Sequence, residues 1–137
     1  MNWIHNGKEI TRIEDFDGAI GFVYLIENLE TSRKYVGKKI LHFTKARQVN
    51  KKRKRYKEES DWKTYYGSSD DLLRDLEILG PEKFSRVILH LCHSKAEMSY
   101  LELAEQISRE ALLREDYYNS WISARVRTSH LKGLQKQ

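Results

Sequence analysis

The chain has 137 residues, a length that suits one compact domain with a hydrophobic core. Its composition, 39% hydrophobic and 33% charged, excludes a disordered or membrane-embedded protein. The net charge of +5 is unevenly distributed, because residues 45–57 hold eight Lys or Arg residues and no acid. The remaining 17 basic and 20 acidic residues make the rest of the chain mildly acidic.

Residues 1–20 mix apolar and charged residues without a clear period. We expect them to form an N-terminal extension or a short helix packed at the edge of the domain. The first ten residues lack the basic-then-apolar order of a signal peptide, and no apolar run is long enough to span a membrane. The single cysteine, Cys92, lies in an apolar run and has no second cysteine to pair with. These features predict a reduced, cytoplasmic protein.

Residues 22–37 alternate in the period-2 pattern of two strands, with a polar turn from Asn28 to Arg33 between them. In an antiparallel hairpin, directly opposed residues share a face, which allows Tyr24 and Tyr35 to lie together. Gly37 falls on the same face and leaves it uncovered. The pattern therefore predicts a hairpin with two phenols on the floor of a pocket, and an ordinary buried hairpin is the alternative.

Residues 45–57, which we name the basic segment, follow this hairpin. Clustered like charges oppose helix formation without an anionic partner, so we expect only partial order. A solvated charge run is one interpretation, and a phosphate-binding surface is the other. The position next to the tyrosine hairpin favours phosphate binding. An aromatic cluster of Trp62, Tyr65 and Tyr66 comes directly after it.

The second half of the chain predicts a helix, a strand and a second helix. Asp70 and Asp71 suit the first turn of a helix that Gly80-Pro81 ends. Residues 84–92 have the apolar pattern of a buried third strand. Ser94 and Glu97 are spaced as in a capping box and predict a helix that runs to about residue 113. We expect an α+β fold in which helices flank a small three-stranded antiparallel sheet. The predicted domain spans residues 21–122, and residues 123–137 form a basic tail.

Several stretches together resemble one family of nucleases. Residues 22–24 and 35–37 resemble the two halves of the GIY-YIG motif, at its usual spacing. Asp61–Ser69 resembles a DWxxYYGSS stretch of small phage-type members of that family. Glu102 with Gln106, and Tyr117–Asn119 after them, match two further motifs in order. The resemblance covers most of residues 21–122 and implies the α+β fold described above.

The resemblance implies a metal-dependent endonuclease that hydrolyses phosphodiester bonds in double-stranded DNA, with a phage homing-type nuclease as one option. Glu102 is the expected metal ligand. A carboxylate completed by water and phosphate suits Mg²⁺ or Mn²⁺. On a helical wheel Glu102 lies outside the apolar arc of its helix, so Glu105 is the rival ligand. A non-catalytic nucleic-acid-binding module with the same fold is the alternative function.

The resemblance also implies roles for the tyrosines. Tyr35 resembles the tyrosine beside the attacking water, and Tyr24 the one that organises it. A phenol titrates near pH 10, so a general-base role requires that a metal or a cation lower its pKa. Lys39 or the basic segment could supply that charge. Asn119 resembles a family asparagine near the metal, and a turn-forming role is its alternative.

The family expects an arginine that clamps the phosphate after the second half of the motif. The usual offset falls near Lys45, so the candidates are Arg47, Arg53 and Arg55, of which the longer insertion favours the last two. The residues expected to bind nucleic acid are Lys45, Arg47, Lys51, Lys52, Arg53, Lys54 and Arg55. The sequence leaves open the DNA specificity, nicking versus double-strand cleavage, and the oligomeric state, for which a dimer is one option.

Overall fold

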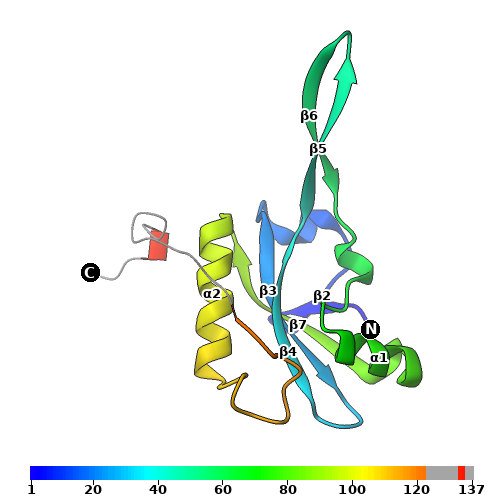
Figure 1. Ribbon diagram of the computed structural model, residues 1–137, viewed down its shortest axis with the longest axis vertical. Coiled ribbons are helices and arrows are strands. Elements are labelled where there is room, and N and C mark those ends of the chain that lie inside the picture. Colours follow the sequence, from blue (N-terminus) through cyan, green and yellow to red (C-terminus); the bar gives the residue numbers. More distant parts are fainter. Residues whose placement is uncertain (123–132, 135–137) are drawn as a thin grey trace.

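A mixed five-stranded sheet forms the centre of the computed structural model, which describes residues 1–122 and 133–134 (Figure 1). The strand order is β2-β1-β7-β3-β4, which places β4 at an edge. Two further strands, β5 and β6, form a sheet of their own. The strands are β1 (Trp3–His5), β2 (Lys8–Ile10), β3 (Gly21–Asn28), β4 (Lys34–Ile40), β5 (His42–Val49), β6 (Lys52–Glu59) and β7 (Phe84–Cys92).

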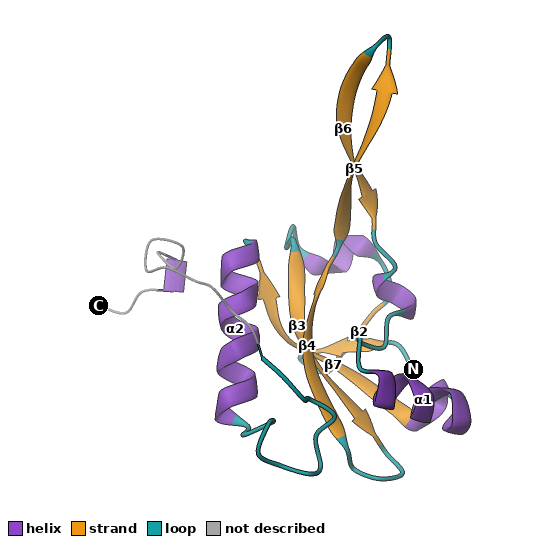
Figure 2. Cartoon of the chain, in the orientation of Figure 1, coloured by secondary structure: helices purple, strands orange, loops and turns teal. Residues whose placement is uncertain are grey.

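Helices cover both faces of this sheet (Figure 2). Helix α2 (Lys95–Ser108) packs on β3 and β4, over a cluster that includes Val23, Val36 and Met98. Helix α1 (Asp70–Leu79) and the short 3-10 helices η1 (Ile13–Phe16) and η2 (Trp62–Thr64) belong to the other side. A third 3-10 helix, η3 (Pro81–Lys83), joins α1 to β7. The main core lies on that second side, around the aromatic rings of β1, β3 and η2.

The β3–β4 hairpin has the predicted register. Tyr24 lies opposite Gly37, and Ile26 lies opposite Tyr35, so the two tyrosines share a face. The turn is built by Asn28, whose side-chain oxygen accepts hydrogen bonds from the backbone N–H groups of Glu30 and Thr31. The predicted pairing of the two tyrosines on one face is confirmed.

The sheet is larger than predicted, because five strands replace the expected three. Residues 1–20, expected to be an extension or a short helix, contribute β1 and β2, and β1 pairs parallel to β7. Strands of three residues are too short to show alternation. The overlooked signal is Asn6-Gly7, where both residues have positive φ (52° and 79°), as a two-residue hairpin turn requires.

The basic segment is also more regular than predicted. It forms most of the antiparallel β5–β6 hairpin, with Val49 opposite Lys52. Asn50 and Lys51 both have positive φ and make the two-residue turn. Arg47 lies over the Tyr56 ring, 5.3 Å from its centroid, which offsets some repulsion between the like charges. The expected partial order is therefore corrected to a two-stranded ribbon.

The remaining elements follow the prediction closely. Helix α1 ends at Gly80, and β7 spans residues 84–92 as expected. The Ser94 hydroxyl accepts a hydrogen bond from the Glu97 N–H at the start of α2, but the helix ends at Ser108 rather than near 113. No helix among the described residues is long and apolar enough to cross a membrane. The predicted basic tail lies outside the described residues, apart from 133–134.

Substitution of Trp3 tests whether β1 contributes to the stability of the core. Its ring is 1% exposed, lies edge-on to Phe22 at 4.9 Å, and its indole N–H donates to the Trp62 carbonyl at 2.7 Å. We expect Trp3→Ala to lower the free energy of unfolding by about 3–5 kcal/mol, as for other buried Trp truncations. Urea denaturation would measure it. Trp121, which is 72% exposed, supplies the control, since Trp121→Ala should change stability by less than about 0.5 kcal/mol. Equal effects would contradict the proposed role of β1.

Candidate active site

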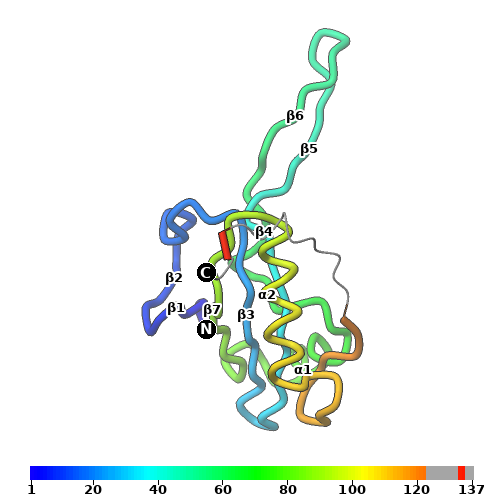
Figure 3. The backbone as a smooth tube through the Cα atoms, turned by 90° about the vertical axis from the view of Figure 1, so that its left-hand side faces the viewer, coloured from blue at the N-terminus to red at the C-terminus, as the bar shows by residue number. Residues whose placement is uncertain are grey.

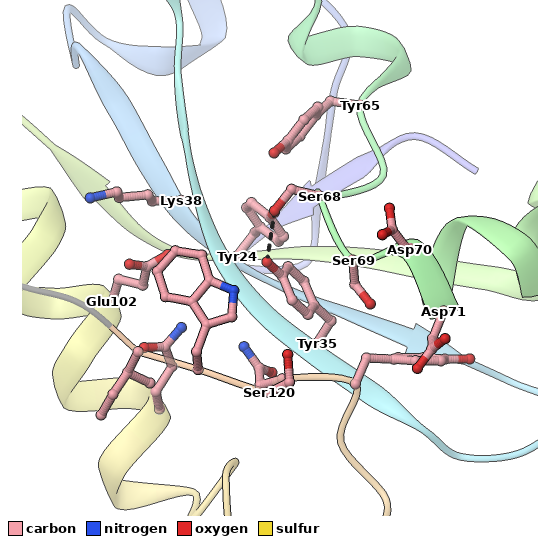
Figure 4. Close-up of a pocket in the computed structure, with 15 residues that line it drawn as sticks. Tyr24, Tyr35, Lys38, Tyr65, Ser68, Ser69, Asp70, Asp71, Glu102 and Ser120 are labelled. Atoms are coloured by element: carbon pink, nitrogen blue, oxygen red, sulfur yellow. Dashed lines mark hydrogen bonds between the residues drawn. The ribbon is translucent and has the colours of Figure 1, made fainter.

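A pocket of about 600 Å³ lies beside β4 (Figure 4). Its lining comes from β3, β4, the first turn of α1, α2, residues 118–122, and the loop residues Tyr65, Ser68 and Ser69. Because β4 is an edge strand, side chains from the two faces of the sheet can meet around it. The sheet edge therefore brings together residues that are far apart in the sequence.

Tyr24 and Tyr35 stand at the centre of this pocket (Figure 4). Their ring centroids are 6.2 Å apart, and Tyr24 is buried whereas Tyr35 is half-buried. The face above Gly37 is not left empty as predicted, because the Tyr24 ring fills it. A Cβ at Gly37 would collide with the Tyr24 hydroxyl and lie 2.9 Å from Tyr35 Cε1. Glycine at this position is what allows the two phenols to approach.

The loop before α1 supplies a hydrogen-bond partner for Tyr35. The Tyr35 hydroxyl and Ser68 Oγ are 3.0 Å apart. Gly67 has a φ of +89°, and a Cβ there would lie 3.2 Å from the Tyr35 ring. This glycine therefore brings Ser68 up to the phenol. Ser68 and Tyr65 line the pocket and were not among the predicted site residues, although both belong to the DWxxYYGSS stretch.

Both phenols are held in the neutral form. Burial raises the pKa of Tyr24 well above its usual 10, and neighbouring Tyr65 and Tyr35 add to the effect. Burial also raises the pKa of Tyr35, while the hydrogen bond between Tyr35 and Ser68 opposes the rise. The protein's own groups therefore do not give either tyrosine the lowered pKa that a general base needs. A positive charge brought into the pocket would favour ionisation.

Lys39 is not placed to supply that charge. Its ammonium pairs with Asp61 at 2.6 Å and lies 3.9 Å from the centroid of the Tyr65 ring. Lys39 therefore holds the segment from Asp61 to Tyr65 in place and does not line the pocket. Lys38 takes the position in the lining, and its Nζ donates to Ser99 Oγ at 2.7 Å. The strand period explains the difference, because consecutive residues of β4 point to opposite faces.

Glu102 reaches the pocket from α2, on the same side as Lys38 (Figure 4). Burial raises the pKa of its carboxyl group, and the charge of Lys38 lowers it in part. Glu105, the rival ligand, lies outside the lining. It bonds Arg109 Nε at 2.9 Å and pairs with His90 Nε2 at 2.8 Å. Of the two carboxylates, Glu102 is the one available to a ligand.

Asn119 lines the pocket while holding the edge strand. Its side-chain oxygen accepts a hydrogen bond from the Val36 N–H at 3.0 Å, and its amide nitrogen donates to the Val36 carbonyl at 2.8 Å. Gln106 donates to the same carbonyl at 3.2 Å. These bonds satisfy the outer edge of β4 where another strand would otherwise pair. The structure therefore gives Asn119 a positioning role beside the site.

The three candidate arginines are not brought to the pocket. Arg47 and the pair Arg53 and Arg55 lie on the β5–β6 hairpin, which projects from the body of the domain (Figure 1). Lys38 is the one cationic side chain in the pocket lining among residues 1–122 and 133–134. A catalytic arginine is therefore not assigned by this arrangement.

The acidic groups of the pocket are dispersed. Asp70 and Asp71 lie across the pocket from Glu102 (Figure 4). In the part of the chain that the structure describes, no three His, Cys, Asp or Glu side chains group together as metal ligands would. An ion beside Glu102 would therefore take most of its ligands from water and substrate. Mg²⁺ commonly binds in this way, so the donor set fits the expected metal.

Comparison with known proteins is consistent with this arrangement. A family model described as "Putative endonuclease segE, GIY-YIG domain" matches residues 3–122. The matched range includes β1 and β2 as well as the pocket residues. Neither a curated protein nor a solved structure matches the chain.

The opposite environments of Glu102 and Glu105 predict opposite effects on stability. An acid with a raised folded-state pKa costs stability when it is ionised, so Glu102→Gln should raise the melting temperature at neutral pH. Burial works against Glu105 ionisation too, but bonds from Arg109 and His90 outweigh it and lower its pKa. Glu105→Gln should therefore lower the melting temperature at neutral pH.

The Glu102 difference should fade as the pH falls through its raised folded-state pKa and be gone near the usual glutamate value. The Glu105 difference should begin to fade only near that usual value, about 4.3, and be lost as the pH falls through its lowered folded-state pKa. Calorimetry between neutral and acidic pH would measure the trend. If the Glu102→Gln variant melts at a lower temperature than wild type at neutral pH, the protein already stabilises the Glu102 carboxylate of wild type, which would contradict the prediction.

Proposed function

Because the chain belongs to the GIY-YIG endonuclease domain family, whose model matches residues 3–122, we propose that it is a metal-dependent endonuclease that hydrolyses phosphodiester bonds in double-stranded DNA. The observation that carries the proposal is the convergence of Tyr35, Lys38, Ser68 and Glu102 on one pocket. Such hydrolysis needs an oriented water, a proton acceptor and positive charge near the phosphoryl oxygens.

The residues of the pocket divide these tasks. Lys38 places a positive charge where phosphoryl oxygens gain negative charge. Tyr35 and Ser68, whose hydroxyl oxygens are 3.0 Å apart, can orient a water between them and the phosphate. Tyr35 can accept the proton of that water only as a phenolate. Its raised pKa means that few molecules hold the phenolate at neutral pH until positive charge enters the pocket.

Glu102 would hold the Mg²⁺ or Mn²⁺ ion, with water and phosphate as its other ligands. Such an ion supplies charge neutralisation at the phosphate and lowers the pKa of groups near it. Glu102 must be ionised to bind the ion, and burial already disfavours the charged form. Metal binding should therefore weaken as the pH falls, and it should relieve an unfavourable charge in the folded protein.

From the resemblance to phage-type members of the family, we further propose that the protein is a homing-type nuclease that acts in the cytoplasm of a host cell. Such a role requires cleavage at one or a few sites of a genome, which sequencing of cleaved genomic DNA would measure. Cleavage at many unrelated sites would favour a less specific nuclease. A binding module without activity would leave DNA intact under all metal conditions.

Glu102→Ala tests the metal ligand. We expect it to abolish cleavage of supercoiled plasmid in Mg²⁺, because the substitution removes the ligand, and EDTA should abolish wild-type cleavage in the same way. DNA binding, measured by mobility shift in EDTA, should change little. Glu105→Ala is the matched control and should keep its activity. Near wild-type cleavage by Glu102→Ala would move the metal site elsewhere.

Tyr35→Phe tests the chemical role of the hydroxyl. The ring is kept, so stability should change little, while the single-turnover rate should fall by about 10²–10⁴-fold, the usual range for a lost general base. The logarithm of the wild-type rate should rise with pH above neutrality, because the phenolate fraction grows, and the variant should lose this dependence. Tyr66→Phe, outside the pocket lining, is the control. An active Tyr35→Phe enzyme with a flat profile in both proteins would exclude phenolate catalysis.

A further inference from the structure

The β5–β6 hairpin, residues 42–59, is a ribbon that stands apart from the core, and we name it the basic arm (Figure 3). Its strands pair only with each other. Every residue of β6 is exposed, as are residues 43–48 of β5. An isolated two-stranded ribbon is marginally stable in water. A long ribbon without a core therefore suggests that a binding partner packs against it and stabilises it.

The register divides the arm into two faces, since directly opposed residues share a face. Gln48 lies opposite Arg53, and Ala46 lies opposite Arg55. Arg47 lies opposite Lys54 on the other side of the ribbon. The arginine face carries Thr44, Ala46, Gln48, Arg53, Arg55 and Lys57, whereas the lysine face carries Lys45, Arg47, Val49, Lys52, Lys54 and Tyr56.

The cations of the arm differ in whether they contact other side chains of the arm. On the lysine face, Arg47 lies over the Tyr56 ring and Lys45 pairs with Glu58. On the arginine face, Arg53 and Arg55 are both exposed, and neither pairs with another side chain among the described residues, which is also true of Lys52 and Lys54 on the lysine face. Within the part of the chain that the structure describes, both guanidinium groups are therefore accessible to an external ligand.

The chemistry of the arginine face is that of base recognition. An Arg fork fits O6 and N7 of guanine, and Gln fits N6 and N7 of adenine, both in the major groove. The methyl groups of Ala and Thr can contact the thymine methyl. Lys, by contrast, acts as a point charge toward phosphates. A major groove about 12 Å wide admits a two-stranded ribbon.

We propose that the basic arm enters the major groove of duplex DNA with its arginine face toward the base edges, where Gln48, Arg53 and Arg55 determine sequence preference. The long lysines of the opposite face bend toward phosphates along the groove walls. This inference builds on the proposed DNA substrate. It assigns Arg53 and Arg55 to recognition rather than to the clamping of the scissile phosphate.

The tip of the arm supports this assignment. Lys51 occupies a turn position with a φ of +63°, which favours glycine over residues with a side chain. A backbone conformation that is unfavourable for lysine therefore occurs at the point that would lead into the groove. A lysine there adds a cation to the advancing end of the ribbon, next to Lys52.

The test measures binding by the full chain in EDTA, where a metal-dependent nuclease does not cut. Sequences bound by wild type are first selected from a random duplex library. Arg53→Lys/Arg55→Lys keeps both charges and removes both forks. It should lose preference for the selected sequence by about 5- to 150-fold per lost base contact, while binding to scrambled DNA changes little.

Lys52→Ala/Lys54→Ala is the matched control on the opposite face. It should weaken binding to all sequences alike and flatten the slope of log K against log salt by about 2. Melting curves of both variants should overlay wild type, because all four side chains are exposed.

Base analogues in the selected site test the groove itself. Replacing guanine by 7-deazaguanine removes N7 from the major groove and should weaken wild type but not the double Lys variant. Replacing guanine by inosine removes the minor-groove amino group and should change binding little. Sensitivity to inosine alone, equal losses in both double variants, or no selected sequence would each overturn the proposal. Cleavage of plasmid by a protein that selects no sequence would still support the nuclease.

Discussion

The Tyr24 ring lies over Gly37, its directly opposed partner in the β3–β4 pair, and the geometry of the site depends on this contact. Any side chain at Gly37 would displace the phenol. A register slip of one residue in β4 would turn Tyr35 to the α2 face, away from Tyr24. The contact also ties the site to the core, because Tyr24 packs edge-on to Trp3 at 5.3 Å. The candidate site and the core therefore share one hairpin.

The edge position of β4 explains how a small sheet can combine groups from both of its faces. Tyr35 and Gly37 point to one side, whereas Lys38 points toward α2 and Glu102. In a central strand, the neighbouring strands would separate these groups. Asn119 and Gln106 instead complete the backbone bonding of the edge with side chains. The pocket can open there without leaving the Val36 backbone unsatisfied.

The pocket and the basic arm differ in the charges that they carry. Burial in the pocket disfavours both the Glu102 carboxylate and the Tyr35 phenolate. Positive charge at the pocket would relieve both costs at once, and it would couple ionisation of the two groups to the binding of a cation. The cations of the chain are concentrated on the exposed basic arm, where water screens their mutual repulsion. Under the proposed function, DNA binding and chemistry would therefore be carried by different elements.

Local patterns in the sequence determined much of the fold. The alternation of β3 and β4, the Ser94 N-cap of α2 and the stop at Gly80 are set by neighbours within a few residues, so the sequence alone predicted them. The strands β1 and β2 were missed, because three residues carry no readable period. The β5–β6 ribbon was missed because cross-strand partners, rather than local propensity, overcome the repulsion of its charges.

The sequence by itself also directed attention to this pocket, since Tyr24, Tyr35 and Glu102 were predicted from the family resemblance and all three line it. Only the tertiary structure decided which of two adjacent lysines faces the pocket, which glutamate is free, and that the candidate arginines lie on the arm. Those choices depend on strand pleat, helix rotation and partners far apart in the chain, such as His90 and Arg109 for Glu105. Sequence separation does not encode such contacts, because they form only when the elements pack.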